Sequence, residues 1–153
     1  MKNIFKCFFC LIISIFIFSN VQALDLDIQS SNAILYNTDE NKVLYQKNEN
    51  EKVQIASLTK IMTAIITLEK IDNLDKTVTL VTEDFKGLLE ENLVVSGFKV
   101  GQTVSYRDLL YGLLLPSGAD AAKALARNVG GTEEEFVRLM NEKAKSLNLK
   151  NTS

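Results

Sequence analysis

Two serines and one lysine are the residues of this chain whose types and spacing favour covalent chemistry. Ser57 and Lys60 lie three positions apart in the segment ASLTK, so on a helix their side chains lie on one face. A serine hydroxyl becomes an effective nucleophile when a neighbouring group removes its proton. A lysine accepts that proton only as the neutral amine, which burial or a nearby positive charge favours. The pair therefore predicts a nucleophile and its base near a helix N-terminus, where free backbone N–H groups can bind an oxyanion.

Ser117 is the third candidate, and each of the three also has an ordinary structural explanation. It follows Pro116 in the segment GLLLPSGADAA, in a predicted turn between two apolar helices. A hydroxyl on such a turn can be directed into a cleft. Alternatively, Ser57 and Ser117 are helix N-caps and Lys60 is a solvated surface residue. The spacing alone leaves both interpretations open.

The composition restricts the acid–base chemistry of the chain. Histidine is absent from all 153 residues, which excludes a Ser-His-Asp triad, a Cys-His dyad and a histidine zinc site within them. Any base must therefore be Lys, Asp, Glu or Tyr. The two cysteines, Cys7 and Cys10, both lie near the N-terminus.

Residues 1–23 have the pattern of a secretory signal peptide. Lys2 and Lys6 precede an apolar run and a small-residue exit, which predicts cleavage after Ala23. The run is shorter than the roughly 20 residues that span a bilayer, and an uncleaved N-terminal anchor is the alternative. A mature chain would have no cysteine, and therefore no disulfide.

The charge of the mature chain argues against nucleic acid as a partner. Of the 17 basic residues, two lie in the signal; the 15 that remain stand against 19 acidic residues, a net charge of −4. There is also no run of basic residues to bind phosphates.

The pattern of apolar residues predicts one hairpin, one further strand and four helices. Residues 33–36 and 43–45 are expected to form the hairpin, across the turn-rich segment NTDENK. A short strand is expected within 76–81, and loops with short elements within 82–102. The first helix, beginning at about residue 57, is apolar nearly all round, which favours burial in the middle of the fold.

The later helices have clear start and stop signals. Residues 105–115 form an apolar helix that should end before Pro116. An Ala-rich helix follows and is closed by Gly130-Gly131. Thr132 and Glu135 predict a capping box for the last helix.

Together, IASLTKIMTA (55–64) and LLLPSGADAA (113–122) resemble the motifs of penicillin-binding D-alanyl-D-alanine carboxypeptidases of the serine peptidase S11 type. The hairpin segment also resembles that family, and the similarity runs from about residue 28 to the end. It implies an α/β (α+β) fold of the β-lactamase/DD-peptidase-like transpeptidase kind. In this fold an antiparallel sheet is flanked by a helical subdomain.

The resemblance also implies roles for the three candidate residues. Ser57 would be the acyl-ester nucleophile, Lys60 the proton acceptor and Ser117 a proton relay toward the leaving group. The implied substrate is a peptidoglycan stem peptide that ends in D-Ala-D-Ala. β-Lactams would be covalent inhibitors, and no cofactor or metal is implied.

Two departures from the family pattern set the limits of this expectation. The second motif is usually Ser-x-Asn, but position 119 is Ala, and Asp120 should point elsewhere on a helix. The third motif, Lys-Thr/Ser-Gly, is not found, since Lys76-Thr77 is followed by Val78. Residues 24–153 are therefore expected to be the N-terminal part of a catalytic domain, truncated before the third motif.

Three interpretations follow for the function. The first is an exported carboxypeptidase of wall metabolism, acting in the cell wall or at the outer face of the cytoplasmic membrane. Membrane contact would then come from a C-terminal segment that follows residue 153. The second is a β-lactamase, which shares the motif and fold. The third is a non-catalytic penicillin- or wall-binding fragment, favoured by Ala119 and the missing third motif.

Overall fold

The computed structural model describes residues 26–153. The predicted signal peptide lies outside the described residues. The chain divides into two compact units, Met1–Glu51 and Lys52–Ser153. Each unit is described by itself.

The described part of the first unit is a β-hairpin. Strands β1 (Ala33–Asn37) and β2 (Lys42–Lys47) pair antiparallel, with an irregular register between Leu35 and Tyr36. The Asn37 side chain accepts hydrogen bonds from the backbone N–H groups of Asp39 and Glu40, which shapes the turn. The predicted hairpin is thus confirmed. None of its strand residues is fully buried.

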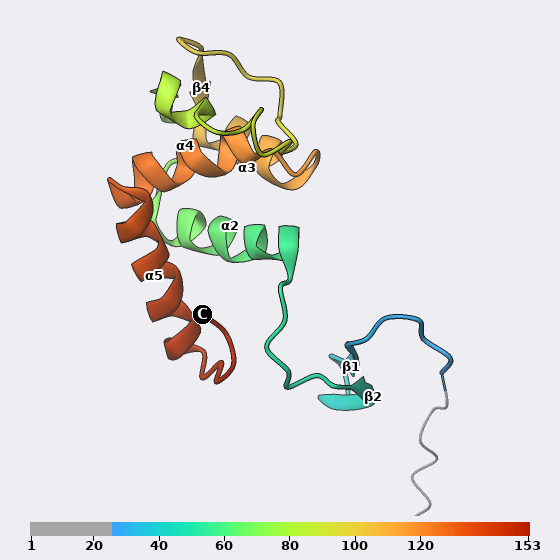
Figure 1. Cartoon of the computed structure of the whole chain (residues 1–153). Coiled ribbons are helices and arrows are strands. Elements are labelled where there is room, and N and C mark those ends of the chain that lie inside the picture. The colour runs from blue at the N-terminus through green and yellow to red at the C-terminus, as the bar shows by residue number, and fades with distance from the viewer. Residues whose placement is uncertain (1–25) are drawn as a thin grey trace, which may run out of the picture. The chain divides into compact units, whose positions relative to one another are not determined.

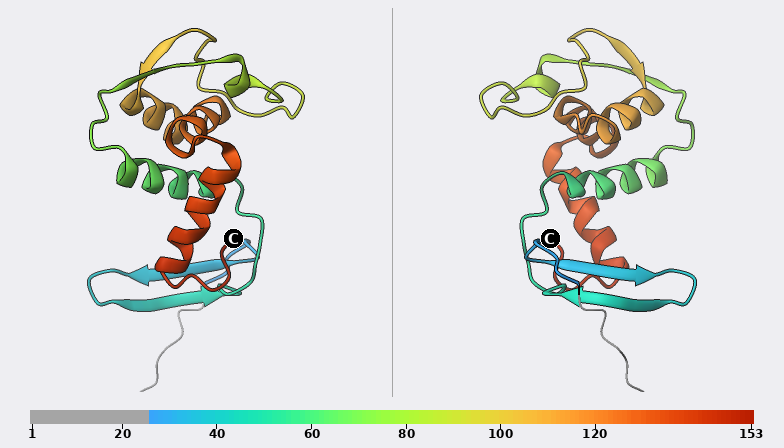
Figure 2. Two further views of the ribbon diagram at one scale, coloured as in Figure 1. Left: turned by 90° about the vertical axis from the view of Figure 1, so that its left-hand side faces the viewer. Right: turned by 90° about the vertical axis from the view of Figure 1, so that its right-hand side faces the viewer.

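Four α-helices dominate the second unit. They are α2 (Thr59–Lys70), α3 (Tyr106–Leu114), α4 (Ala119–Gly130) and α5 (Glu133–Ser146). Helix α4 contacts the other three. Figures 1 and 2 show α3 and α4 in a middle layer with α2 beneath them, and α5 inclined steeply to α2. Among residues 26–153, no helix is long and apolar enough to cross a membrane.

A small sheet lies on the opposite side of α3 and α4 from α2 (Figure 2). Strand β3 (Thr77–Thr79) lies within the segment predicted to be a strand, and it pairs antiparallel with β4 (Thr103–Ser105). Strand β4 was not expected, because three residues leading into a helix carry too little alternation to show a strand. The short 3₁₀ helix η2 (Thr82–Phe85) follows β3.

The predicted helix ends are largely confirmed. Helix α3 ends at Leu114, before Pro116, and α4 is closed by Gly131 at φ 84°. Thr132 caps α5 by accepting a hydrogen bond from the Glu135 N–H. The reciprocal half of the expected capping box is missing, because the Glu135 carboxylate pairs with Arg138.

The main core of this unit is built from aliphatic side chains of α3 and α4 and of the β3–β4 sheet, with Leu80, Leu109, Leu113 and Leu125 almost fully buried. The expectation that the nearly all-apolar α2 is buried in the middle of the fold is wrong for one of its faces. Ala64, Ile66 and Thr67 face the core, but Ile61 and Leu68 are each 55% exposed. The described residues cover one face of α2 only, so an all-apolar pattern did not predict full burial here.

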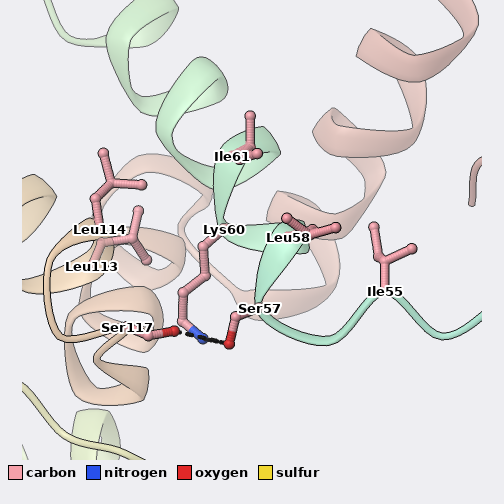
Figure 3. A pocket seen from close by; sticks show the side chains of 8 residues that line it. All are labelled: Ile55, Ser57, Leu58, Lys60, Ile61, Leu113, Leu114 and Ser117. Atoms are coloured by element: carbon pink, nitrogen blue, oxygen red, sulfur yellow. Dashed lines mark hydrogen bonds between the residues drawn. The ribbon is translucent and has the colours of Figure 1, made fainter. Parts of the chain in front are cut away.

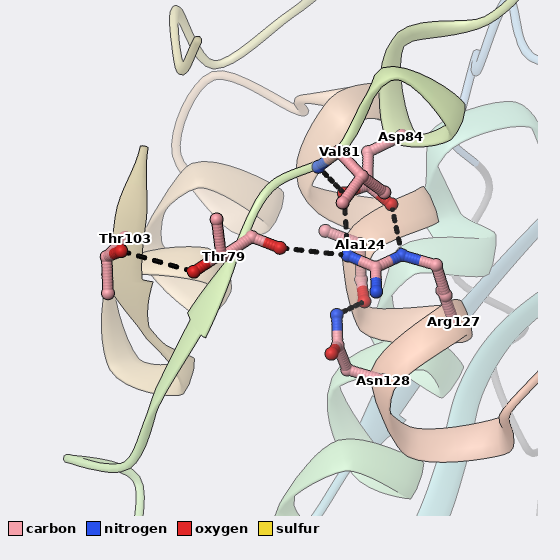
Figure 4. Close-up of polar contacts among 7 residues, drawn as sticks. All are labelled: Thr79, Val81, Asp84, Thr103, Ala124, Arg127 and Asn128. Atoms are coloured by element: carbon pink, nitrogen blue, oxygen red, sulfur yellow. Dashed lines mark hydrogen bonds and ion pairs between the residues drawn. The ribbon is translucent and has the colours of Figure 1, made fainter. Parts of the chain in front are cut away.

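An ion pair fixes η2 to α4. Arg127 donates two hydrogen bonds of 2.9 Å to the Asp84 carboxylate, which is almost fully buried, and a third to the Thr79 carbonyl (Figure 4). Asp84 also accepts from the Val81 N–H. The hydrogen bonds from Arg127 to Asp84 raise the pKa of the guanidinium, which is charged at any physiological pH.

Candidate active site

The first half of the site is the turn that opens α2. Ser57 lies in the 3₁₀ helix η1 (Ala56–Leu58), and Lys60 is the second residue of α2. Neither η1 nor α2 has a side-chain hydrogen bond at its N-cap. The Lys60 Nζ donates to the Ser57 Oγ at 3.5 Å, at the outer limit of a hydrogen bond. The expectation that these two side chains meet is confirmed.

Ser117 forms the other half of the site, on the turn between α3 and α4. Its hydroxyl donates to the Ser57 Oγ at 2.8 Å, across sixty residues of sequence. Figure 3 shows the three polar side chains pointing toward one another from the two sides of a pocket. Ser57 Oγ thus accepts hydrogen bonds from Lys60 Nζ and from a second hydroxyl, so a possible base lies within reach of it.

Neither serine serves as a helix cap. Gly118 is the N-cap residue of α4, without a side-chain hydrogen bond. The N-cap positions of η1 and α2 are Ile55 and Leu58. The capping explanation of Ser57 and Ser117 is therefore wrong.

The pocket has a volume of about 490 Å³ and a largely apolar lining. Apart from the three polar residues, its walls are Ile55, Leu58, Ile61, Leu113 and Leu114. Lys60 is half-buried, so the described residues desolvate its side chain only in part. Leu58 and Ile61 are mostly exposed to solvent. No cluster of three possible metal ligands occurs among the residues that the structure describes.

Strained backbone conformations occur at or next to the two serines of this pocket. Six non-glycine residues between 26 and 153 have a positive φ, and four of them are Asn, which tolerates this conformation. The other two are Ala56 at φ 47° and Ser117 at φ 66°. A left-handed conformation costs such residues about 1–2 kcal/mol each, and strained residues cluster at functional sites. No pattern in the sequence indicated this strain.

The contacts made behind the Ser117 turn were not predicted from the sequence. Asp120 and Gly118 are buried, and Ser96, from a loop two dozen residues earlier, contacts both. Asp120 does point away from the pocket, as its helical position predicted. Ala119 is half-buried and has no polar side-chain atom for the role that Asn has in the usual motif.

A capping box fixes the start of α3, the helix that leads into the Ser117 turn. Asp108 accepts hydrogen bonds from the hydroxyl and the N–H of Ser105, and its own N–H donates to the Ser105 Oγ. These hydrogen bonds lower the pKa of the Asp108 carboxyl; the bond from the Ser105 hydroxyl has the larger effect and the bond from the Ser105 N–H the smaller.

Comparison with known proteins places the chain in a family. The family model of the D-alanyl-D-alanine carboxypeptidases, peptidase family S11, matches residues 19–153. The chain belongs to this family. The resemblance drawn from the two serine motifs is thereby confirmed.

Several characterised proteins are similar to the chain. The D-alanyl-D-alanine carboxypeptidase DacF of Bacillus subtilis is 38% identical over 129 residues, which are 82% of this chain and 32% of DacF. The D-alanyl-D-alanine endopeptidase of Pseudomonas aeruginosa is 36% identical over 84% of this chain and 41% of its own length. The chain thus spans about a third to two fifths of the length of the curated relatives it matches.

The fold is similar to that of a solved DD-peptidase. The crystal structure of the Streptomyces K15 DD-transpeptidase matches with a TM-score of 0.80 and 35% identity, covering 84% of this chain and 52% of that chain. The expected α+β, DD-peptidase-like fold is confirmed by this match.

Proposed function

We propose that this protein is a serine-type D-Ala-D-Ala carboxypeptidase that removes the terminal D-alanine from peptidoglycan stem peptides. Family membership supports the class of reaction. The single observation that carries the assignment of residues is the contact of Ser57 Oγ with both Lys60 Nζ and Ser117 Oγ.

The proposed reaction proceeds through an acyl-enzyme. Neutral Lys60 removes the hydroxyl proton as Ser57 Oγ attacks the carbonyl carbon of the penultimate D-alanine. The peptide C–N bond then breaks, and a proton delivered through Ser117 leaves with the amine of the terminal D-alanine. Water hydrolyses the Ser57 ester and restores the free hydroxyl. Penicillins would acylate the same oxygen.

The apolar walls of the pocket support this chemistry. Leu113 and Leu114 line the pocket together with Lys60, whose side chain is half-buried. Backbone N–H groups at the start of η1 and α2 would bind the oxyanion that develops on the substrate.

We further propose that the protein is exported. The N-terminal 23 residues would direct secretion and be removed after Ala23. Residues 24–153 would then be the N-terminal part of a catalytic domain that works in the cell wall or at the outer face of the membrane. Mass spectrometry of the protein secreted by a bacterial host would give the mature N-terminus directly, expected at Leu24.

A fluorescent penicillin tests the acyl-enzyme proposal. The purified chain from residue 24 should acquire a covalent label, and peptide mass spectrometry should locate it on Ser57. Ser57→Ala should abolish labelling. Ser146→Ala, a change of an exposed α5 serine, is the matched control and should label normally.

Lysine variants test the base. Lys60→Ala should slow labelling by about 10²–10⁴-fold, the usual contribution of a positioned acid–base group. Lys70→Ala, at the other end of the same helix, should have no effect. Equal loss in both variants would contradict the role of Lys60.

Product assays separate the alternatives. Release of D-alanine from a pentapeptide, without rapid turnover of the penicillin, identifies a carboxypeptidase. Rapid turnover of the penicillin identifies a β-lactamase. A folded chain that binds penicillin reversibly without a covalent label would be a non-catalytic binding module, and the proposed activity would be wrong for it.

A further inference from the structure

Ser96 is inserted between the end of α3 and the start of α4, directly behind the Ser117 turn. Its hydroxyl lies 2.9 Å from the Gly112 carbonyl oxygen and 2.9 Å from Asp120 Oδ1. Its backbone N–H donates to the same Asp120 oxygen at 2.8 Å. Gly112 and Asp120 lie on either side of Ser117 in the chain, so one side chain ties together both ends of the turn.

Two glycines make room for this insertion. A Cβ atom on Gly118 would lie 1.8 Å from Ser96 Oγ, and one on Gly112 would lie 2.8 Å from it. Neither glycine has a positive φ, so the need is for space and not for an unusual backbone conformation. The small residues and Ser96 therefore fit one another closely at this junction.

Backbone hydrogen bonds complete the junction. The Gly118 N–H donates to the Gly112 carbonyl, and the Ala119 N–H donates to the Val94 carbonyl. Residues 94–96 thus hold the first residues of α4 through three separate groups. The turn has little freedom left, which explains how Ser117 keeps its left-handed conformation.

Asp120 is the residue of this junction that lowers the stability of the fold. It is 1% exposed, and its Oδ2 atom is buried without a hydrogen-bond partner in the part of the chain that the structure describes. A buried, half-satisfied carboxylate destabilises a fold. Features that break a local rule of stability are most often found where function requires them.

We propose that Asp120, through Ser96, is a positioning residue that holds the Ser117 hydroxyl against Ser57 for acyl transfer. The inference rests on the proposed function. Asp120 touches neither Ser57 nor Lys60, and it acts by fixing the turn between Gly112 and Gly118. We call Ser96 and Asp120 together the clamp.

Acylation kinetics with a fluorescent penicillin test the clamp. Asp120→Ala should lower the acylation rate constant by about 10²-fold, because a displacement of about 1 Å at a reacting group has that effect. The dissociation constant of the initial, non-covalent complex should change little. Asp120→Asn keeps an oxygen that accepts from Ser96 and should retain most of the rate.

Asp84→Asn is the matched control. Asp84 is as deeply buried as Asp120 but pairs with Arg127, away from the pocket. It should lower the free energy of unfolding and leave the acylation rate constant unchanged. If Asp120→Ala and Asp84→Asn both lower stability and neither slows acylation, Asp120 is only structural and the proposal is overturned.

Amide hydrogen exchange and amide chemical shifts test the clamp without relying on enzymatic activity. In Asp120→Ala, amide hydrogen exchange at Gly118 and Ala119 should accelerate, and the Ser57 amide resonance should shift. Asp84→Asn should change neither. If the wild-type chain takes no label at all, the proposed function is wrong for this chain, while these amide signals still decide whether the clamp positions Ser117.

A milder variant covers the case in which Asp120→Ala does not fold. Ser96→Ala removes the hydroxyl contacts to Gly112 and Asp120 and keeps the Ser96 N–H bond to Asp120. It should slow acylation less than Asp120→Ala and accelerate exchange at Gly118. Unchanged acylation together with unchanged exchange in Ser96→Ala would overturn the proposal.

Discussion

Ser57 owes its chemical environment to two residues that reach it from different elements. Lys60 is supplied locally, by the first turn of α2, and Ser117 comes from the turn that joins α3 to α4. The local pair is fixed by helical spacing, since residues three apart share a face. The distant contact, from Ser117 Oγ to Ser57 Oγ, depends on the turn between α3 and α4. The position of the Ser117 hydroxyl is therefore set by the backbone conformation of that turn.

Two substitutions separate the hydroxyl of Ser117 from its backbone strain. Ser117→Ala removes the hydroxyl and keeps the Cβ atom on a residue whose φ is 66°. Ser117→Gly removes the hydroxyl and the Cβ atom. Both should slow acylation of Ser57 by a similar factor. The Gly variant should be the more stable by about 1 kcal/mol, because glycine adopts positive φ without steric cost.

Urea unfolding and penicillin labelling of the two variants give the answer. A Gly variant no more stable than the Ala variant would show that Ser117 is not strained. Undiminished labelling in both would show that its hydroxyl does not take part in acyl transfer.

The sequence indicated Ser57, Lys60 and Ser117 as candidate site residues because they stand in short, local motifs with recognisable flanks. It did not predict what holds Ser117 in place. Ser96 and Asp120 are 24 positions apart, and neither residue type nor spacing indicates that a serine in a loop will lie between two glycines of another segment. Such tertiary contacts depend on packing, which has no periodic signature in the chain.

At the scale of elements, a capping box stabilises the start of α3, the helix that leads into the Ser117 turn. Ser105→Ala should remove the N-cap bond and the hydroxyl bond to the Asp108 carboxylate, and it should keep the bond from the backbone N–H of residue 105. We expect it to lower the free energy of unfolding by about 1 kcal/mol at pH 7, the usual value of an N-cap. Removal of the N-cap hydrogen bond should increase the mobility of the N-terminal turn of α3 more than that of its C-terminal end.

The pH dependence of this loss follows from the lowered pKa of Asp108. Because the folded pKa lies below the unfolded value, the stabilisation from the ionised carboxylate is complete above the unfolded pKa. It is lost as the pH falls through the folded pKa. The difference between wild type and Ser105→Ala should therefore shrink toward pH 2.

Urea unfolding across this pH range, with NMR titration of the Asp108 carboxyl, measures both effects. Thr132→Ala is the control, because Thr132 caps α5 without a bond to the Glu135 carboxylate. The loss of unfolding free energy caused by Thr132→Ala should not become smaller at low pH, in contrast to that caused by Ser105→Ala. A pH-independent cost for Ser105→Ala would mean that only the cap bond, and not the carboxylate, stabilises α3.

At the scale of elements, the pattern of apolar residues predicted the helices and the hairpin more accurately than it predicted burial. All four helices were expected from periodicity and from cap and stop residues. The apolar pattern of α2 indicated burial in the middle of the fold, yet Ile61 and Leu68 are largely exposed. Periodicity shows which faces are apolar, but the partner that covers a face comes from elsewhere in the fold.

At the scale of the whole molecule, the two units differ in how much core they have. Residues 52–153 contain every residue of both hydrophobic clusters. The hairpin of β1 and β2 has no fully buried strand residue, and an isolated two-stranded hairpin is marginally stable at best in water. The stability of the four helices should therefore be independent of the hairpin.

A chain of residues 52–153 alone should fold. We expect it to keep the helical circular dichroism of α2–α5 and to unfold cooperatively, because Leu80, Leu109, Leu113 and Leu125 belong to a core cluster made of residues of this unit. Residues 26–51 alone should give the spectrum of an unfolded peptide. Since Ser57, Lys60 and Ser117 all belong to the helical unit, the Ser57 amide resonance should stay where it is in the longer chain. Loss of cooperative unfolding on removal of the hairpin would show instead that the hairpin supplies part of the core on which the Ser57–Ser117 contact depends.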